Sequence, residues 1–230
     1  MNNSEFFSKT KGKLIVSCQA LEDEPLHSSQ IMARMAYAVM LGGAAGIRAN
    51  SVADIEAIKN AVDLPVIGII KKIYSDSEVY ITPTETEIDN LVQCGVDVIA
   101  TDATDRPRPE GGGREVFFRA VRERYPDQLF MADCATLDDG IAAERLGFDV
   151  VSTTLCGYTE ATRDDPKPNI RLIRDLIRNV RIPVVVEGGI WDKETFDQVR
   201  AIEGVHAVVI GSAITRPMEI TRYFLQGVSK

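Results

Sequence analysis

The chain has only two histidines and four cysteines among its 230 residues, and the cysteines show no paired Cys-x-x-Cys spacing. Structural zinc sites are built mainly from these two residue types at short, regular spacings, so their scarcity argues against a zinc site. It also argues against a disulfide framework, and we interpret the four thiols as the reduced thiols of an intracellular protein. We therefore expect no metal site.

Positive charge and long apolar runs are also scarce. Lysine and arginine total 26 against 34 aspartates and glutamates, which gives a formal net charge of −8. A nucleic-acid groove needs a basic face, so this balance argues against a nucleic-acid partner. No apolar run reaches membrane-spanning length, and the start MNNSEFFSKTKGK lacks the apolar centre of a signal peptide. We expect a cytoplasmic protein without a membrane partner.

Eight short apolar segments recur along the chain and begin roughly 20 to 34 residues apart, a spacing typical of strand–helix units. They are Leu14–Cys18, Ala44–Arg48, Val66–Ile70, Asp97–Thr101, Leu129–Asp133, Asp149–Thr153, Pro183–Glu187 and His206–Ile210. Most are continuously apolar rather than alternating, as expected of strands that are covered on both faces. We interpret them as eight parallel strands.

Helix signals fit between these segments. Thr84 and Glu87 have the spacing of a capping box at a helix start, and Ser51 and Asp54 have a similar arrangement. Three glycines stand where a helical pattern ends shortly before the next strand: Gly95, Gly147 and Gly204. The pattern thus indicates a helix between most successive strands.

Eight strand–helix units in this length predict an α/β fold, a single-domain (β/α)₈ TIM barrel over residues 1–230, with residues 1–12 as an N-terminal extension or helix. The alternative is an open, doubly wound parallel sheet. A Gly-rich G-x-G-x-x-G turn after the first strand would favour that sheet, but SCQALEDEP contains no glycine. The barrel is therefore preferred.

The third strand leads into two adjacent lysines. In such a barrel, polar residues at the carboxyl ends of the strands are the catalytic candidates. Side chains alternate along a strand, so only Lys71 can share a face with Ile69, while Lys72 turns the other way. If Lys71 points inward, burial would lower its pKa and suit it to act as a general base or as a Schiff-base nucleophile. The alternative is a solvated lysine at a strand exit.

Two carboxylates close apolar strands at the same edge, Asp133 on the fifth strand and Glu187 on the seventh. A buried carboxylate is costly without a partner, and we predict that Lys71 and Glu187 form an acid–base pair across the barrel mouth. Asp133 could instead cap a helix. Arg48, at the end of the second strand, could bind an anionic or hydroxyl-rich substrate or pair with a structural carboxylate.

Glycine-containing turns follow the last two strands. Gly188 and Gly189 follow the seventh strand, and Gly211 and Ser212 follow the eighth. Many barrels bind phosphate with the loops at these two positions, where glycine lets the backbone approach the phosphate oxygens. Both could also be tight turns that simply need glycine. We predict that these four residues bind a phosphate group.

The segment DATDRPRPEG, residues 102–111, is rich in proline and glycine and follows the fourth strand. We interpret it as a loop over the same face, with Asp102 and Asp105 in a lid or in contact with a sugar. Arg106 and Arg108 within it could be surface charges only.

Nine segments of the chain resemble, in order, one known family. They are IVSCQALEDEPL, AAGIRANSVADI, PVIGIIKK, ITPT, ATDATDRPRPEG, MADCATLDDG, TTLCGYT, VVVEGGI and IGSAITRP. From about Lys13 to Phe224 they closely resemble the N-acetylmannosamine-6-phosphate 2-epimerase family. Any one segment would be weak evidence, but the ordered set is highly specific.

The resemblance implies a phosphate-binding barrel that interconverts N-acetylmannosamine 6-phosphate and N-acetylglucosamine 6-phosphate. This step belongs to sialic acid (N-acetylneuraminate) catabolism and feeds amino-sugar metabolism. The resemblance implies that Lys71 is the catalytic base and Glu187 its partner, and that Gln19, Arg48 and Asp133 contact the substrate. It implies a small phosphosugar substrate, and nothing in the sequence demands a metal or an organic cofactor. From barrels of this size we expect a homodimer.

Two rival functions stay open. One is a Schiff-base aldolase, or another sugar-phosphate isomerase, on the same barrel. The other is a non-catalytic sugar-phosphate sensor that keeps the phosphate loops. The combination of Lys71 with Glu187 argues against the sensor, because binding alone needs no acid–base pair.

Overall fold

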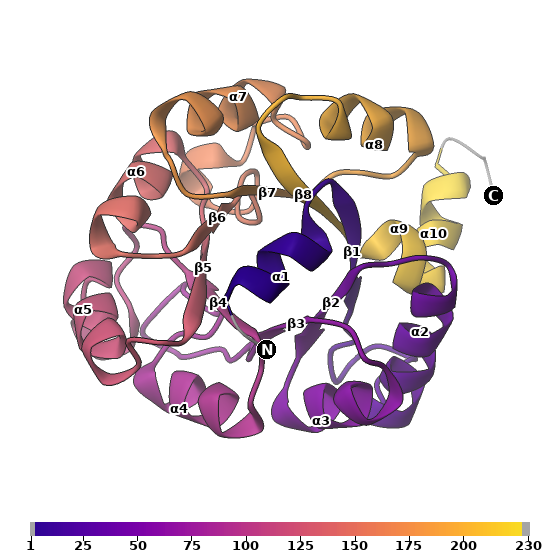
Figure 1. The fold of residues 1–230 in the computed structure, drawn as a ribbon, viewed down its shortest axis with the longest axis horizontal. Helices are drawn as coiled ribbons and strands as arrows, with labels where there is room; N and C mark the ends of the chain where they lie inside the picture. The colour runs from indigo at the N-terminus through magenta and orange to yellow at the C-terminus, as the bar shows by residue number, and fades with distance from the viewer. Residues whose placement is uncertain (1–2, 227–230) are drawn as a thin grey trace.

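Eight parallel strands close into a ring in which each strand pairs with the next along the chain and β8 pairs with β1 (Figure 1). The computed structural model describes residues 3–226. The strands are β1 Lys13–Cys18, β2 Gly46–Asn50, β3 Val66–Ile69, β4 Val98–Asp102, β5 Leu129–Asp133, β6 Val150–Ser152, β7 Val184–Glu187 and β8 Val205–Ile210. The prediction of a (β/α)₈ TIM barrel is confirmed, and the open doubly wound sheet is excluded.

Helices surround the ring on its outside (Figure 1). They are α1 Asn3–Thr10, α2 Ser29–Leu41, α3 Val52–Ala61, α4 Glu85–Cys94, α5 Arg114–Arg124, α6 Leu137–Leu146, α7 Ile170–Asn179, α8 Lys193–Arg200, α9 Ser212–Thr215 and α10 Pro217–Phe224. Short 3₁₀ turns, Pro109–Gly111 and Glu160–Thr162, lie in the loops after β4 and β6. Over residues 3–226, no helix combines the length and apolar character needed to cross a bilayer.

Helix α1 is the exception to the outer ring, because it lies across one end of the barrel (Figure 1). Its Phe6 and Thr10 are fully buried. Phe6 packs in one cluster with the inward-facing strand residues Ile15, Ile67, Ile69, Val98, Ala100, Leu129, Met131, Val150, Val185, Ala207 and Val209. The amino-terminal end of the barrel is thereby closed, and the carboxyl ends of the strands are left for the site.

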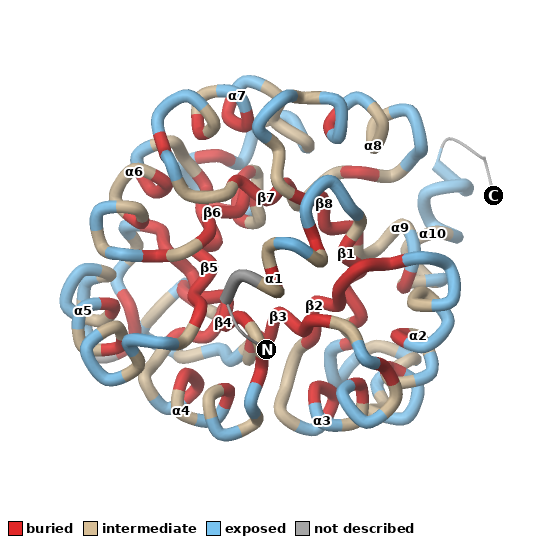
Figure 2. The backbone as a smooth tube through the Cα atoms, in the orientation of Figure 1, coloured by how far each residue is buried: buried red, intermediate tan, exposed pale blue. Residues whose placement is uncertain are grey.

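Most strand residues are buried, as the red colour of the ring in Figure 2 shows, and the two apolar clusters cover both faces of the strands. Their outward side chains, such as Ile47 and Val66, belong to a second apolar cluster with the surrounding helices. This two-sided burial is the physical reason for the continuous apolar runs in the sequence. Alternation then places polar side chains above the inner apolar layer, because Met131 is followed two residues later by Asp133 and Val185 by Glu187.

Strand β2 differs from its predicted extent. It was expected at Ala44–Arg48 but runs from Gly46 to Asn50, so Arg48 lies in mid-strand opposite Ser17 and Ile67. A lone arginine is expensive to bury, which favours placing it at a strand end. Here two carboxylates across the barrel compensate its charge, and the strand continues past it.

The helix caps follow the predicted chemistry with one exception. Thr84 and Glu87 form the capping box of α4, and Gly95 ends that helix in the left-handed region with φ 67°. Gly204 does not cap a helix, because α8 ends four residues earlier, at Arg200. Gly204 instead has φ 97° in the turn before β8, where a side chain would collide with Ile177.

Candidate active site

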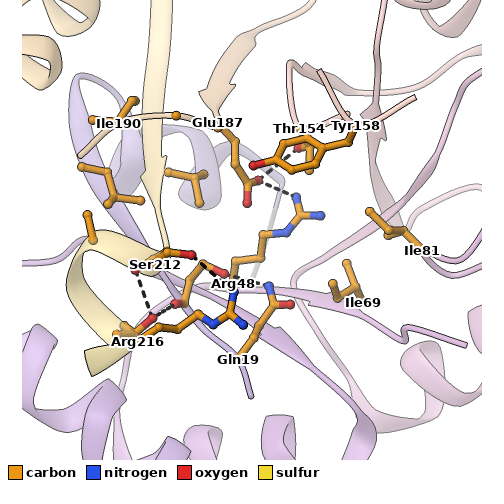
Figure 3. A pocket seen from close by; sticks show the side chains of 18 of the residues that line it. Gln19, Arg48, Ile69, Ile81, Thr154, Tyr158, Glu187, Ile190, Ser212 and Arg216 are labelled. Atoms are coloured by element: carbon orange, nitrogen blue, oxygen red, sulfur yellow. Dashed lines mark hydrogen bonds and ion pairs between the residues drawn. The ribbon is translucent and has the colours of Figure 1, made fainter. Parts of the chain in front are cut away.

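A cavity of about 240 Å³ opens at the carboxyl ends of the strands (Figure 3). It is lined by residues from the loops after β1, β3, β6, β7 and β8 together with Arg48 of β2. Of the predicted site residues, the lining includes Gln19, Arg48, Lys71, Glu187, Gly188, Gly189, Gly211 and Ser212. The barrel thus brings eight of the nine predicted residues to one cavity.

The two lysines after β3 separate as alternation predicts. Lys71 lines the cavity, and its backbone N–H donates to Asn50 Oδ1 at 2.7 Å, which fixes the chain at the strand exit. Lys72 points away, with 51% of its side chain exposed, and its Nζ lies 3.2 Å from Glu87 Oε1. Only Lys71 is therefore placed for chemistry in the cavity.

The environment of Lys71 favours its neutral form. Burial is the largest influence and lowers its pKa, the positive charge of Arg48 lowers it further, and Glu187 partly offsets both. The net effect is a pKa below the ordinary 10.5 of a lysine. No hydrogen bond or ion pair to Lys71 Nζ occurs within residues 3–226. The lowered pKa makes the neutral amine, the form that can accept a proton, more accessible than in an ordinary lysine.

Arg48 is the centre of a buried charge cluster. Its Nη1 lies 3.0 Å from Asp133 Oδ1 and its Nη2 lies 2.6 Å from Asp133 Oδ2, a two-pronged pair. The same Nη1 lies 3.0 Å from Glu187 Oε2. Burial alone would lower the pKa of Arg48, but the two carboxylates raise it, so the guanidinium stays charged. Arg48 therefore holds both carboxylates in place.

Glu187 combines an anchored oxygen with one that faces the cavity. Its Oε2 forms an ion pair with Arg48 Nη1, and it accepts a hydrogen bond from the hydroxyl of Thr154 at 3.1 Å (Figure 3). Burial raises its pKa, Arg48 lowers it and the charge of Asp133 raises it, with a net value above the ordinary 4.5. The other oxygen, Oε1, has no hydrogen bond or ion pair inside the described part of the chain. Glu187 can thus carry a proton on the oxygen that faces the cavity.

The predicted partner of Glu187 was Lys71, but the ion pair that Glu187 makes is with Arg48. Lys71 and Glu187 line the same cavity and influence each other electrostatically. Asp133 is fully buried behind Arg48 and does not line the cavity. It does not cap a helix; its carboxylate is taken by Arg48 and by Thr154 Oγ1 at 2.8 Å.

Both glycine loops line the cavity, and a cation follows the second of them. Gly188 and Gly189 have φ 108° and 73°, conformations that favour glycine, and an added Cβ at Gly189 would collide with the backbone of Lys167. On the other loop, Arg216 Nη1 lies 3.5 Å from Ser212 Oγ and Arg216 Nε donates to Glu24 Oε2 at 2.8 Å. The loops supply backbone amides, a hydroxyl and one guanidinium.

Gln19 carries an acceptor without a partner. Its Nε2 donates to Ser17 Oγ at 2.7 Å, while its Oε1 is buried and finds no hydrogen-bond partner within residues 3–226. A buried amide oxygen without a donor is unfavourable, which is typical of groups that meet a ligand.

The loop after β4 does not contribute to this cavity. Asp102 is fully buried and binds Thr104 and Arg106, so it organises the loop internally. Arg108, interpreted as a possible surface charge, is 3% exposed, and its guanidinium stacks 3.7 Å from the ring centre of Phe117. Asp105 is exposed. The interpretation of Asp102 as a sugar contact finds no support in this geometry.

A search with family profiles places residues 32–230 in the NanE family, described as "Putative N-acetylmannosamine-6-phosphate epimerase". The chain belongs to the NanE family. Two curated relatives share the description "Putative N-acetylmannosamine-6-phosphate 2-epimerase". The protein of Enterobacter sp. (strain 638) is 54% identical over 95% of this chain and 93% of its own length. The protein of Caldanaerobacter subterraneus subsp. tengcongensis is 50% identical over 96% of this chain and 93% of its own length.

A solved NanE-family structure has the same fold. It is described as the N-acetylmannosamine-6-phosphate 2-epimerase from Clostridium perfringens, with 48% identity, a TM-score of 0.90, and coverage of 96% of this chain and 95% of that one. The resemblance seen in the sequence is thereby confirmed at the level of the family.

Three residues of this NanE-family site were not assigned a role from the sequence, although Thr154 was among the polar residues at the strand ends. Thr154 and Ser17 are ordinary polar residues near strand ends, and Arg216 follows the second glycine loop. The segments that resemble the family contain all three, but their side-chain type alone does not single them out. Within residues 3–226, no group of three or more histidine, cysteine, aspartate or glutamate side chains has a metal-binding arrangement.

Proposed function

We propose that this chain interconverts N-acetylmannosamine 6-phosphate and N-acetylglucosamine 6-phosphate by removing and returning the proton on carbon 2 of the sugar, a step in sialic acid catabolism. Relatives at about half identity over nearly the whole chain carry this activity in their names. The observation that carries the proposal is Lys71, a half-buried amine with a lowered pKa in the same cavity as Glu187 and the two glycine loops.

The chemistry requires a base and no redox step. The hydrogen on carbon 2 is acidic only when carbon 1 is an aldehyde, so the sugar ring opens first. Lys71 Nζ then takes the proton from carbon 2, the electron pair moves into an enolate, and a proton returns to the opposite face. Because the electron sink is the substrate's own carbonyl, we propose that no cofactor takes part.

The charges around the cavity explain how Lys71 becomes neutral. Arg48 carries one positive charge, and Asp133 with Glu187 carry two negative charges, so the cluster is neutral only with one further proton. That proton lies either on Lys71 or on Glu187. When it moves from Lys71 Nζ to Glu187 Oε1, the amine gains the lone pair that it needs for carbon 2.

The substrate roles of the remaining residues follow from their positions. We assign the phosphate to Gly188, Gly189, Gly211 and Ser212, and we add Arg216, whose guanidinium lies beside Ser212. The unpartnered Oε1 of Gln19 is assigned to a hydroxyl or N–H of the sugar. Arg48 and Asp133 remain in the substrate-binding set, with Asp133 acting through Arg48 because it has no exposed surface. Cytoplasmic localisation and a homodimer stay predictions.

The decisive experiment is a proton NMR spectrum of N-acetylmannosamine 6-phosphate incubated with the protein in deuterated water. We expect N-acetylglucosamine 6-phosphate with deuterium at carbon 2. Absence of turnover would favour the non-catalytic sugar-phosphate sensor over the epimerase. If borohydride in the presence of the phosphosugar labels Lys71 covalently, a Schiff-base aldolase replaces the epimerase.

The same assay tests the base. Lys71→Ala removes the proton acceptor, so we expect epimerisation to fall by about 10²- to 10⁴-fold, the range typical of general base catalysis, while phosphosugar binding changes little. The matched control is Lys72→Ala, which removes a lysine that points away from the cavity. Activity of Lys71→Ala within a few-fold of the wild type, or equal losses in both variants, contradicts the assignment.

A further inference from the structure

Thr154 lies between the carboxylates of Asp133 and Glu187. Because its side chain is uncharged, the ion pairs described above give it no role. It follows β6, and its Oγ1 lies 2.8 Å from Asp133 Oδ1, 3.1 Å from Glu187 Oε2 and 2.8 Å from Ser152 Oγ. Asp133 Oδ1 and Glu187 Oε2 are also the two oxygens that share Arg48 Nη1. The hydroxyl and the guanidinium therefore contact the same pair of acceptors; Figure 3 shows both of them beside Glu187.

A hydroxyl has one proton to donate, although it can accept from others. Thr154 can therefore serve Asp133 or Glu187 at a given moment, but not both. Ser152 is fully buried, and because the proton of Thr154 is directed at a carboxylate, Ser152 donates to Thr154 in either case. The only freedom in this chain of hydrogen bonds is the rotation of the Thr154 hydroxyl.

The two orientations differ in energy according to the charge on Glu187. A hydrogen bond to an ionised carboxylate is much stronger than one to a neutral carboxyl group. When Glu187 is ionised, its Oε2 competes with Asp133 for the Thr154 proton. When Glu187 accepts a proton on Oε1, its Oε2 becomes a weak acceptor, and Asp133 Oδ1 receives the hydroxyl instead.

Resting on the function proposed above, we propose that Thr154 is a positioning residue whose single hydroxyl proton turns between Asp133 and Glu187 as Glu187 loses and gains its proton. No bond to carbon is involved, and the number of protons is conserved. The proton that moves is the one exchanged between Lys71 Nζ and Glu187 Oε1, and the hydroxyl follows it. Thr154 thus sets how readily Glu187 gives and takes that proton.

Other charged and titratable groups also act on Glu187, and the test must separate Thr154 from them. They are Arg48 of β2, Lys71 of the segment after β3, Asp133 of β5 and Tyr158 of the loop after β6. Arg216 and Glu24 act on Lys71 from the far side of the cavity. Replacing Thr154 by valine leaves all six groups in place and removes only the hydroxyl, at nearly constant side-chain volume.

The experiment compares Thr154→Val, Thr154→Ser and the wild type in two measurements. The first is the pH profile of kcat/KM for N-acetylmannosamine 6-phosphate. In Thr154→Val the acidic limb is expected to move upward by about one pH unit, the size expected for a hydrogen bond to a charged group, with KM within about twofold. Thr154→Ser restores the hydroxyl and is expected to return the limb to within about 0.3 pH unit.

The second measurement is independent of turnover. A ¹³C NMR titration of glutamate-labelled protein, with Glu187→Gln to identify the signal, reports the protonation of Glu187 directly. The midpoint of the Glu187 titration is expected to move upward by the same one pH unit in Thr154→Val. Thr10→Val is the matched control, because Thr10 is also a fully buried threonine whose hydroxyl is hydrogen-bonded, at the opposite end of the barrel.

The outcomes separate cleanly. Wild-type protein that does not interconvert the sugars contradicts the proposed function, while the NMR titration still decides the role of Thr154. Active wild type with an unmoved Glu187 titration in Thr154→Val overturns the role of Thr154 alone. It is also overturned if Thr154→Ser or Thr10→Val moves the titration as far as Thr154→Val does, since either result would indicate a general effect on packing.

Discussion

The interior of a barrel mouth is a costly place for a charge, and the carboxylates of Asp133 and Glu187 are paired there with one guanidinium. Arg48 is 1% exposed and is compensated by Asp133 and Glu187. Burying a charge without such compensation is prohibitive, whereas a compensated cluster shifts the pKa values of its members. On the mechanism proposed above, the excess negative charge of this cluster leaves one proton to be shared between Lys71 and Glu187, and this shared proton makes the site reactive.

The pH dependence of activity follows from these two groups. On the proposed mechanism the active form carries one proton between them, so we expect activity to be lost when both or neither is protonated. The pKa of Glu187 is raised above 4.5 by burial, and the pKa of Lys71 is lowered below 10.5 by burial. We expect a bell-shaped profile of kcat/KM whose acidic limb lies above 4.5 and whose basic limb lies below 10.5.

The measurement is the initial rate of epimerisation across the pH range at subsaturating phosphosugar, with protein stability checked at each pH by circular dichroism. Glu187→Gln is the informative variant, because it removes the carboxyl group that titrates. We expect it to abolish the acidic limb of the kcat/KM profile and to lower the rate. A flat profile in the wild type would mean that the two groups do not share the catalytic proton.

At the scale of the elements, the loops after β7 and β8 combine tight backbone geometry with ligand-binding potential. Gly189 has φ 73° and lies directly against the backbone of Lys167, which belongs to the loop after β6. Glycine is required there because a side chain would meet main-chain atoms that cannot rotate away. The loop after β7 is therefore held in position by the loop after β6, which also carries Tyr158.

Gly189→Ala tests this arrangement. The added methyl group forces the two loops apart, and we expect a loss of about 1–3 kcal/mol in the free energy of unfolding together with a higher KM for the phosphosugar. Gly112→Ala is the control, because Gly112 has an ordinary φ of −73° and open space around its Cα. Urea titration and steady-state kinetics measure the two effects. Equal stability of both alanine variants would show that the contact with Lys167 imposes no constraint.

At the scale of the whole molecule, the barrel is closed at its amino-terminal end by α1 and open at the other. Phe6 reaches into the inner apolar cluster to which every strand except β2 contributes, so α1 is part of the core rather than an appendage. The cavity at the opposite end then rests on a packed interior and not on a channel. That support keeps Lys71 and Glu187 at fixed positions above the inner apolar layer.

Phe6→Ala measures how much α1 contributes. Truncating this buried ring leaves a cavity beneath the strands, and we expect the free energy of unfolding to fall by about 3–5 kcal/mol. Val116→Ala is the comparison, because Val116 is an apolar residue of α5 that is 75% exposed. The free energy of unfolding of Val116→Ala should stay within about 0.5 kcal/mol of the wild type, as for most surface substitutions. Equal losses in urea denaturation would mean that α1 does not close the core.

Much of this architecture was readable in the sequence. The eight apolar runs exist because every strand is covered on both faces, and alternation along β3 correctly separated Lys71 from Lys72. The extent of β2 was misread because an arginine in mid-strand is unfavourable until its partners are known. The buried position of Arg108 was missed for the same reason, since its carbonyl and aromatic partners lie on other segments.

Local pattern therefore predicted the fold class, the separation of Lys71 from Lys72 and most of the residues gathered at the barrel mouth, because burial and alternation leave a periodic trace in the chain. Tertiary structure alone decided which of those residues touch. Arg48 meets Asp133 across 85 positions, and Thr154 meets Glu187 across 33. Such contacts depend on closure of the ring, which brings distant strand ends together, and no repeat or spacing along the sequence records them.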